Sequence, residues 1–217
     1  MVITISRTYG SGGRVMGKAL AKKLGIKFYN HDLVRMLSDE TGINEALLGE
    51  SDERLKKSYF GTDTDWMKDP EPLPPSSKKY SSESNLFRLQ AKMIKDIADK
   101  EDCIIMGRCA DTILEGRDDV IRLYCYASHD NCVKRAMDVC GLGEKEIVKR
   151  IASIDKYREN YYRHFTAKAL SDARNYDLCI DTGSKSVDEL SDFVLMYVYV
   201  RTHGCLPGGL KAEDIKL

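Results

Sequence analysis

The chain has 217 residues, of which 42% are hydrophobic and 31% are charged, enough for one globular domain with a sizeable core and a lid or small insertion. Lysine plus arginine and aspartate plus glutamate both total 34, so the net charge does not indicate nucleic acid or an anionic membrane surface as the main partner. No apolar run approaches the ~18 residues of a membrane helix, and the amino-terminal residues have the character of a strand and not of a signal peptide. We therefore expect a soluble, cytoplasmic protein.

The chain begins with a strand-like run over residues 2–5, which leads directly into a glycine-rich segment over 6–14. An apolar-periodic helix is expected over 13–24, so the order is strand, loop, helix. Backbone N–H groups that are exposed by glycines and backed by a helix N-terminus form a concave site for polyphosphate anions. We therefore expect the phosphates of ATP to be bound by Gly10, Ser11, Gly12, Gly13 and Arg14.

The loop departs from the Walker pattern G-x-x-x-x-G-K-[ST] of P-loop proteins. A near match from Gly12 to Lys18 ends in Ala19 and falls inside the expected helix, where the N–H groups are already engaged. Lys18 is interpreted as a solvated helix residue, with phosphate binding as the less favoured alternative. In the register set by the strand, the usual lysine and Ser/Thr positions hold Gly13 and Arg14, so the loop lacks its lysine.

Arg14 supports two interpretations. Its guanidinium would supply a fixed positive charge and a bidentate fork to phosphate oxygens, or it would only cap a surface turn; we favour phosphate binding with a catalytic role. The P-loop Ser/Thr normally ligates Mg²⁺, and neither Gly13 nor Arg14 can do so. The sequence thus has no direct metal-ligand motif, and Thr8, Ser11 or water is expected to serve the Mg²⁺ that accompanies ATP.

Cysteine and histidine usage gives no sign of a protein-held metal centre. The seven cysteines form no C-x-x-C pair, and the four histidines are scattered along the chain. Several of the cysteines lie in apolar, strand-like runs. Reduced structural thiols are therefore expected, and a zinc site is not.

The remaining elements alternate between strand-like and helical patterns. Further strands are expected over 27–30, 102–106, 120–126 and 177–180. Further helices are expected over 31–48, 84–100, 129–140, 144–163 and 186–200. This alternation predicts an α/β fold with a mainly parallel sheet covered on both faces. The segment 51–84 is rich in Ser, Lys, Asp and Pro, so it is expected to be a mobile insertion.

Five groups of residues together resemble the cytidylate kinase-like family of P-loop nucleoside monophosphate kinases. They are Ile5-Ser6-Arg7, Tyr9-Gly10-Ser11-Gly12-Gly13-Arg14, Ile105-Met106-Gly107-Arg108-Cys109-Ala110-Asp111, Asp155-Lys156-Tyr157-Arg158 with Tyr161-Tyr162, and Tyr176-Asp177-Leu178 with Ile180-Asp181-Thr182. The resemblance implies a single P-loop kinase domain over 1–217, with a five-stranded parallel sheet in the order 2-3-1-4-5 and helices on both faces. It also implies an acceptor-binding segment over 31–100, which contains the insertion, and a helical lid within 128–170.

The resemblance also implies where the acceptor would bind. The Gly-Arg-Asp element of cytidylate kinases is similar to Gly107-Arg108 here, so Arg108 is expected to hold the acceptor phosphate, with a loop-end salt bridge as its alternative role. Cys109 stands where the family has Asp. Asp32 and Arg35 begin the helix after the second strand, where the first acceptor contacts of the family lie. A helix cap and a surface residue are equally open interpretations of these two residues.

Arginines of the expected lid are the remaining candidates for catalysis. Arg150 and Arg158 lie two helical turns apart on one face, and Arg135 lies on the preceding helix. Phosphoryl transfer requires positive groups that close over the equatorial oxygens and hold donor and acceptor in line. The alternative is a solvated basic face that pairs with Glu146 and Asp155.

These features predict an ATP-dependent, Mg²⁺-requiring kinase that transfers phosphate directly, without a covalent enzyme intermediate. The favoured acceptor is a nucleoside monophosphate such as CMP or dCMP. Two alternatives stay open at this stage: a nucleotide-binding regulator that has lost catalysis, and a kinase of a different small metabolite. Nucleic acid and membrane partners are not expected, and the oligomeric state is left open.

Overall fold

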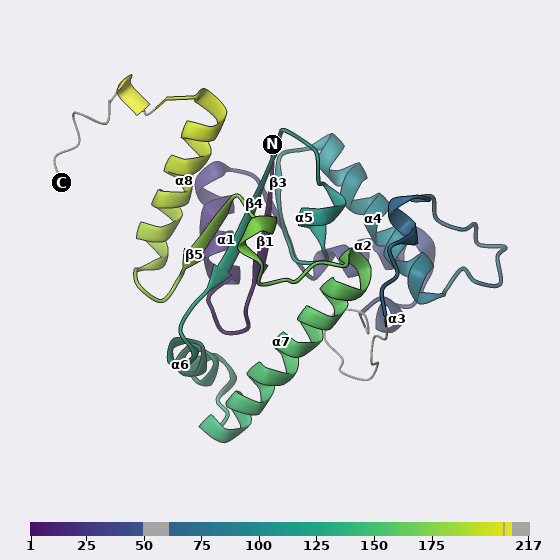
Figure 1. Cartoon of the computed structure of the whole chain (residues 1–217), viewed down its shortest axis with the longest axis horizontal. Coiled ribbons are helices and arrows are strands. Elements are labelled where there is room, and N and C mark those ends of the chain that lie inside the picture. The colour runs from purple at the N-terminus through teal and green to yellow at the C-terminus, as the bar shows by residue number, and fades with distance from the viewer. Residues whose placement is uncertain (50–60, 206, 210–217) are drawn as a thin grey trace.

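A five-stranded parallel sheet forms the centre of the computed structural model, which describes residues 1–49, 61–205 and 207–209 (Figure 1). Its strands are β1 (Val2–Arg7), β2 (Lys27–Tyr29), β3 (Cys103–Met106), β4 (Val120–Tyr126) and β5 (Leu178–Asp181). They lie in the order β2-β3-β1-β4-β5, and every pairing is parallel. The predicted fold class and strand order are confirmed.

Helices cover both faces of the sheet, which explains the continuous apolar runs of its strands. On one face, α1 (Gly13–Leu24) and α8 (Val187–His203) pack side by side over Ile3 and Ile5. On the other face, α2 (Asp32–Thr41), α4 (Glu83–Lys100), α5 (Ala110–Ile113) and the end of α7 (Glu144–Thr166) enclose a second apolar cluster that includes Val2 and Ile105. No helix in the described part of the chain is both long and apolar enough to cross a membrane.

The prediction of a single helix over 31–48 is wrong in one respect, because the structure has two helices there, α2 and α3 (Glu45–Gly49). Gly42 ends α2 in the left-handed conformation, with φ of +71°, and its N–H bonds to the Ser38 carbonyl at 2.9 Å. The Ser38 hydroxyl donates to the Ile43 carbonyl at 2.7 Å. A glycine at this position terminates a helix without steric cost, and the apolar periodicity continues across the break and hides it.

The region 128–170, predicted to be the lid, contains α6 (His129–Cys140) and the whole of the long helix α7, with a short connection at Gly141–Gly143 between them. Figure 1 shows α6 beyond the carboxyl ends of the strands, next to the loop that follows β1. In parallel α/β sheets this edge is where ligands bind. The carboxyl-terminal half of α7 returns to the core, where Phe165 is almost completely buried.

Part of the predicted insertion 51–84 is described by the structure, and it contributes to the core. Trp66, in the short 3₁₀ helix Asp65–Met67, is 5% exposed and donates from Nε1 to the Phe165 carbonyl at 2.7 Å. The Asp63 N–H donates to the His164 carbonyl, also at 2.7 Å. Residues 51–60 lie outside the described residues, and mobility of the insertion stays a prediction.

Replacement of Phe165 by alanine should lower the free energy of unfolding by about 3–5 kcal/mol, because it leaves a cavity where the ring stacks on Phe87 with 4.0 Å between centroids. Phe193→Ala on α8 is the matched control, since that ring is 56% exposed. The control should stay within about 0.5 kcal/mol of wild type. Urea unfolding of the three proteins measures the difference, and equal losses for the two variants would contradict this view of the core.

Candidate active site

The loop between β1 and α1 has the backbone conformation of an anion-binding turn. Gly10 and Gly12 have φ of +77° and +87°, which residues with a Cβ rarely adopt. A Cβ on Gly10 would also lie 2.5 Å from the Cys132 carbonyl oxygen, so α6 can approach the loop only because this residue is glycine. The loop and the first helix of the lid region are thereby held in direct contact.

Interactions of Ser11 hold the loop in shape. The side chain is fully buried, and its hydroxyl donates to the Thr8 carbonyl at 2.9 Å. The Ser11 carbonyl accepts hydrogen bonds from Arg135 Nη1 at 2.6 Å and from the Thr182 hydroxyl. Arg135 also donates to the Thr182 carbonyl, so in this conformation its guanidinium links α6, the phosphate loop and the residue after β5.

The hydroxyl groups of the loop differ in their availability to a metal ion. The Ser11 hydroxyl is committed to Thr8, whereas the Thr8 Oγ1 is buried without a conventional hydrogen-bond partner among the described residues. The described part of the chain contains no cluster of three or more His, Cys, Asp or Glu side chains suited to a metal ion. This donor set fits a Mg²⁺ ion that is held mainly by nucleotide phosphates and water, with Thr8 as the available protein oxygen.

Tyr9 brings the arginines of the lid helix to the phosphate loop. The guanidinium carbon atoms of Arg150 and Arg158 lie 6.0 and 5.8 Å from the centre of the Tyr9 ring, within the range of cation–π contacts. The Tyr9 N–H donates to Asp155 Oδ1 at 2.7 Å, and Arg158 lies 3.8 Å from the same carboxylate oxygen. The two predicted arginines of α7 therefore converge on the loop, and Asp155 and Tyr9 join them there.

The Asp155 carboxylate is held close to the loop at an energetic cost. Burial raises its pKa above the ordinary value, while the Tyr9 N–H and the nearby guanidinium groups of Arg158 and Arg7 act in the opposite direction. A carboxylate on a loop amide occupies the kind of position in which P-loops hold phosphate oxygens. The carboxylate of Asp155 thus lies against the loop between β1 and α1 in this conformation.

A second turn with positive φ angles lies at the end of β3. Gly107, Arg108 and Cys109 all have positive φ, at +72°, +59° and +56°. For the two residues with a Cβ this conformation costs about 1–2 kcal/mol each. Gln90 on α4 accepts from Arg108 Nη1 at 2.8 Å and donates to the Arg108 carbonyl at 3.3 Å, so one side chain fixes both the guanidinium and the strained backbone.

Arg108 lines a pocket at the carboxyl edge of the sheet, together with residues from β1 and α7. The pocket has a volume of about 30 Å³ in this conformation, roughly the room that one or two water molecules need. The residues that line it include Ser6, Arg7, Arg108, Tyr157, Arg158 and Tyr162.

Three predicted site residues lie away from this pocket. Arg14 is exposed on the first turn of α1, and Asp32 is exposed at the start of α2. The Arg35 side chain is 78% exposed and lies 4.0 Å from Asp39. The roles of these three residues stay predictions.

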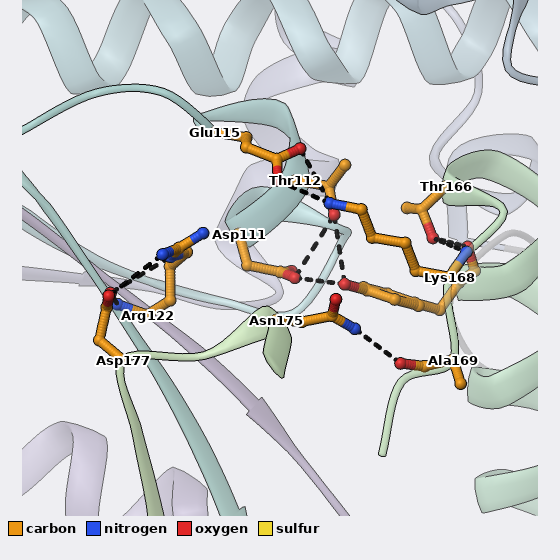
Figure 2. A network of polar contacts seen from close by, with 10 residues as sticks. Asp111, Thr112, Glu115, Arg122, Thr166, Lys168, Ala169, Asn175 and Asp177 are labelled. Atoms are coloured by element: carbon orange, nitrogen blue, oxygen red, sulfur yellow. Dashed lines mark hydrogen bonds and ion pairs between the residues drawn. The ribbon is translucent and has the colours of Figure 1, made fainter. Parts of the chain in front are cut away.

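A buried polar network behind Arg108 connects α5 to the end of the lid helix (Figure 2). Asp111 Oδ2 accepts a hydrogen bond from the Tyr162 hydroxyl at 2.6 Å, and Thr112 contacts the same hydroxyl at 3.2 Å. Lys168, just after α7, pairs with Glu115 at 2.7 Å. Because Tyr162 lines the pocket, this network fixes one wall of the pocket.

A family model, described as the cytidylate kinase-like family, matches residues 2–184. The chain belongs to this family. The predicted resemblance is confirmed, and the match spans the phosphate loop, the Arg108 turn, both lid helices and all strands of the sheet.

Solved structures support the fold of this family member. An uncharacterized protein from Eubacterium ventriosum ATCC 27560 is 26% identical, with a TM-score of 0.65 over 91% of this chain and 98% of that chain. A shikimate kinase from Bacteroides thetaiotaomicron is 12% identical, with a TM-score of 0.51 and the same coverage of both chains. At that identity the likeness shows the P-loop kinase fold alone. Comparison with curated proteins gave no match.

Sequence reasoning did not find Arg7, Tyr9, Asp155 or Gln90 as site residues of this cytidylate kinase-like protein. Arg7, Tyr9 and Asp155 stood inside the motifs that carried the resemblance, but no binding role was given to them, and the role named for Asp155 was a solvated ion pair. Arg7 is the last residue of the first strand, at the edge of the sheet where ligands bind, and this position was the available signal. Gln90 gave no such signal, since its partner is distant along the chain.

Asp111→Asn should flatten the pH dependence of stability. Burial raises the pKa of Asp111 in the folded protein, although the Tyr162 hydroxyl and nearby cations oppose this. The unfolded chain therefore loses this proton at lower pH, and the contribution of Asp111 to stability falls as pH rises above about 4. Asparagine keeps an acceptor for Tyr162 but cannot ionise.

Urea unfolding between pH 4 and pH 8 measures this effect. Wild type should lose stability relative to Asp111→Asn as pH rises. Asp118→Asn, at an exposed position, is the control and should follow wild type. A constant difference between wild type and Asp111→Asn across this range would show that Asp111 does not titrate differently in the two states.

Proposed function

We propose that this protein transfers a phosphoryl group from ATP to a small phosphorylated acceptor, with a nucleoside monophosphate such as CMP or dCMP as the favoured one. The observation that carries this proposal is the position of α7. Its side chains contact the phosphate loop through Tyr9 and line the Arg108 pocket through Arg158. Helix α7 thus reaches both the proposed donor site at the phosphate loop and the proposed acceptor site at the Arg108 pocket, as in-line transfer requires.

On the donor side, the amides from Gly10 to Gly13 hold the ATP phosphates, and Arg14 supplies the charge of the absent lysine. Arg135 holds the loop through the Ser11 carbonyl. Mg²⁺ accompanies ATP, and the buried Thr8 hydroxyl is the protein oxygen that fits it. When bound, this ion neutralises charge on the donor phosphates.

On the acceptor side, Arg108 holds the acceptor phosphate. Asp32 and Arg35 reach the acceptor from the segment after β2 when that segment closes. Arg150 and Arg158, already gathered at Tyr9, close from the lid on the transferring group. The chain's own side chains bind, orient and exclude water, and the proposed transfer runs directly from donor to acceptor.

A kinase of a different small phosphorylated metabolite is the alternative within the same reaction class. Apart from guanidinium groups, the hydrogen-bonding side chains of the pocket lining are hydroxyls of Ser6 and the tyrosines. Hydroxyls can donate or accept, so they read a cytosine edge less specifically than an amide or carboxylate would. The acceptor panel therefore needs sugar phosphates beside nucleotides.

A catalytically impaired nucleotide-binding regulator is the second candidate. The loop lacks the P-loop lysine, and Asp155 lies on the Tyr9 N–H in this conformation. Both features fit a protein that binds nucleotide without transfer. Binding of ATP with no transfer to any acceptor would favour it.

Arg14→Ala should reduce turnover by about 10²- to 10³-fold, the loss typical of removing a group that stabilises charge in the transition state. Lys18→Ala is the matched control, because Lys18 is an exposed cation one helical turn further along α1. The assay is ³¹P NMR of the protein with MgATP and each nucleoside monophosphate or sugar phosphate in turn, following ADP and the phosphorylated product.

Formation of CDP by wild type and Lys18→Ala, but not by Arg14→Ala, would support the proposed kinase and the role of Arg14. Near-normal turnover of Arg14→Ala would remove that role. Absence of transfer to any nucleotide or sugar phosphate, with ATP still bound, would overturn the kinase proposal in favour of the regulator.

A further inference from the structure

Helix α8 carries apolar side chains on its outer face as well as on the face that packs on the sheet. Its inner stripe, which includes Leu190, Val194 and Val198, is buried against α1 and the sheet. On the opposite side, Phe193 and Met196 are 56% and 44% exposed. Figure 1 shows α8 at the outer edge of the molecule, where no other described element lies beyond it. A helix that is apolar on all sides is normally covered on all sides, so the outer face calls for a partner.

The outward residues of α8 follow the spacing of a helix that packs lengthwise against another helix. Positions three, four and seven residues from Met196, in either direction, lie on the same face as Met196. We call this set the α8 outer face, and with Met196 it consists of Glu189, Asp192, Phe193, Tyr199, Val200 and His203. All seven residues are exposed or half-buried. The face is thus apolar in its middle and polar at both ends.

The charges of the α8 outer face are distributed unevenly along the helix. Glu189 and Asp192 lie in its first two turns, His203 lies at its end, and no acidic residue of α8 follows Asp192. Lys185 approaches Glu189 at 3.9 Å, and Lys23 pairs with Asp192 at 2.6 Å. The two carboxylate side chains are nevertheless 59% and 68% exposed, so they stay accessible to a further partner.

A second copy of the same face fits this distribution when the two helices run in opposite directions. Glu189 and His203 are each seven residues from Met196, so a two-fold axis at Met196 places Glu189 opposite the partner's His203. The same axis places Phe193 opposite the partner's Tyr199, and aromatic pairs of this kind are favourable. A parallel arrangement would bring like charges together, and an anionic membrane would be repelled by the two carboxylates.

We propose that the α8 outer face is the interface of a homodimer, in which α8 packs antiparallel on its copy around a two-fold axis at Met196. The helix has 17 residues and is about 25 Å long, so the contact is near the lower limit of specific interfaces. A reversible dimer with a Kd on the order of 10–100 μM is therefore expected, and dilute protein is monomeric. The proposal is independent of the proposed function.

Sedimentation velocity of the full chain, from about 2 to about 500 μM, measures this association. The mass of wild type should rise with concentration from 24.6 kDa toward twice that value. Met196→Glu should raise the Kd more than about 10-fold, because two carboxylates would then meet at the axis. Met67→Glu is the matched control, since Met67 is 45% exposed but lies in the 3₁₀ helix Asp65–Met67, and it should associate as wild type does.

Two further comparisons test the antiparallel geometry. An equimolar mixture of Met196→Glu and Met196→Lys should associate at least about fivefold more tightly than either variant alone, because opposite charges then meet at the axis. His203→Lys should lower the Kd about 2- to 5-fold, and His203→Glu should raise it by a similar factor, because this side chain faces Glu189 across the interface.

Circular dichroism and thermal unfolding show which variants fold, and the opposite effects of the two His203 variants keep the test decisive if the Met196 variants do not. Wild type that stays monomeric up to about 500 μM overturns the proposal, whether the chain's own tail or another protein then covers the face. A dimer that is unaffected by Met196→Glu places the interface elsewhere and also overturns it. A mixture that associates no better than its components overturns the two-fold arrangement at Met196.

Discussion

Two glycines, Gly10 and Gly107, determine how this site is assembled, because other parts of the chain approach their backbone closely. At Gly10, the carbonyl of Cys132 lies where a Cβ would be, and the first helix of the lid region therefore rests on the phosphate loop. At Gly107, the Arg7 guanidinium lies in the space that a side chain would fill. Because β1 lies between β3 and β4 in the sheet, its carboxyl end meets both contacts at once. The glycine-rich loop, the Arg108 turn and helix α6 are thus gathered around a single strand end.

The core stabilises features at this edge that are unfavourable by themselves. Arg108 and Cys109 are held in the left-handed region, Asp111 is buried, and cations are crowded around the pocket. Side chains from the surrounding helices support these features. Gln90 on α4 accepts a hydrogen bond from Arg108, and Tyr162 on α7 donates one to Asp111. Strained conformations of this kind persist only where the surrounding contacts hold them in place, and they are concentrated at functional sites. The aromatic packing of α7 on α4 therefore also positions the site.

The sequence was sufficient to predict the sheet and the glycine-rich loop after its first strand, because both have local signals. Buried parallel strands are short apolar runs, and glycine between a strand and a helix indicates a phosphate loop. Helical periodicity placed Arg150 and Arg158 on one face of a helix, but it did not indicate that both contact Tyr9. The break at Gly42, the link between Gln90 and Arg108, and the path of Arg7 over Gly107 depend on residues that meet only in the folded chain. No local pattern encodes such contacts.

The loop lacks the P-loop lysine, and the positive charges near it are supplied by other parts of the structure. A P-loop lysine is carried by the loop and reaches the phosphates without any movement of a lid. Here the guanidinium groups at the loop come largely from other elements, namely Arg135 from α6 and Arg150 and Arg158 from α7. Charge on the donor phosphates would then be fully compensated only when these helices are closed. The same helix α7 places the Asp155 carboxylate on the Tyr9 N–H, directly before the Gly10–Gly13 amides that are proposed to hold the donor phosphates. Under the proposed function, a bound polyphosphate would therefore lie beside this carboxylate, and repulsion between the two anions would favour a different position of α7.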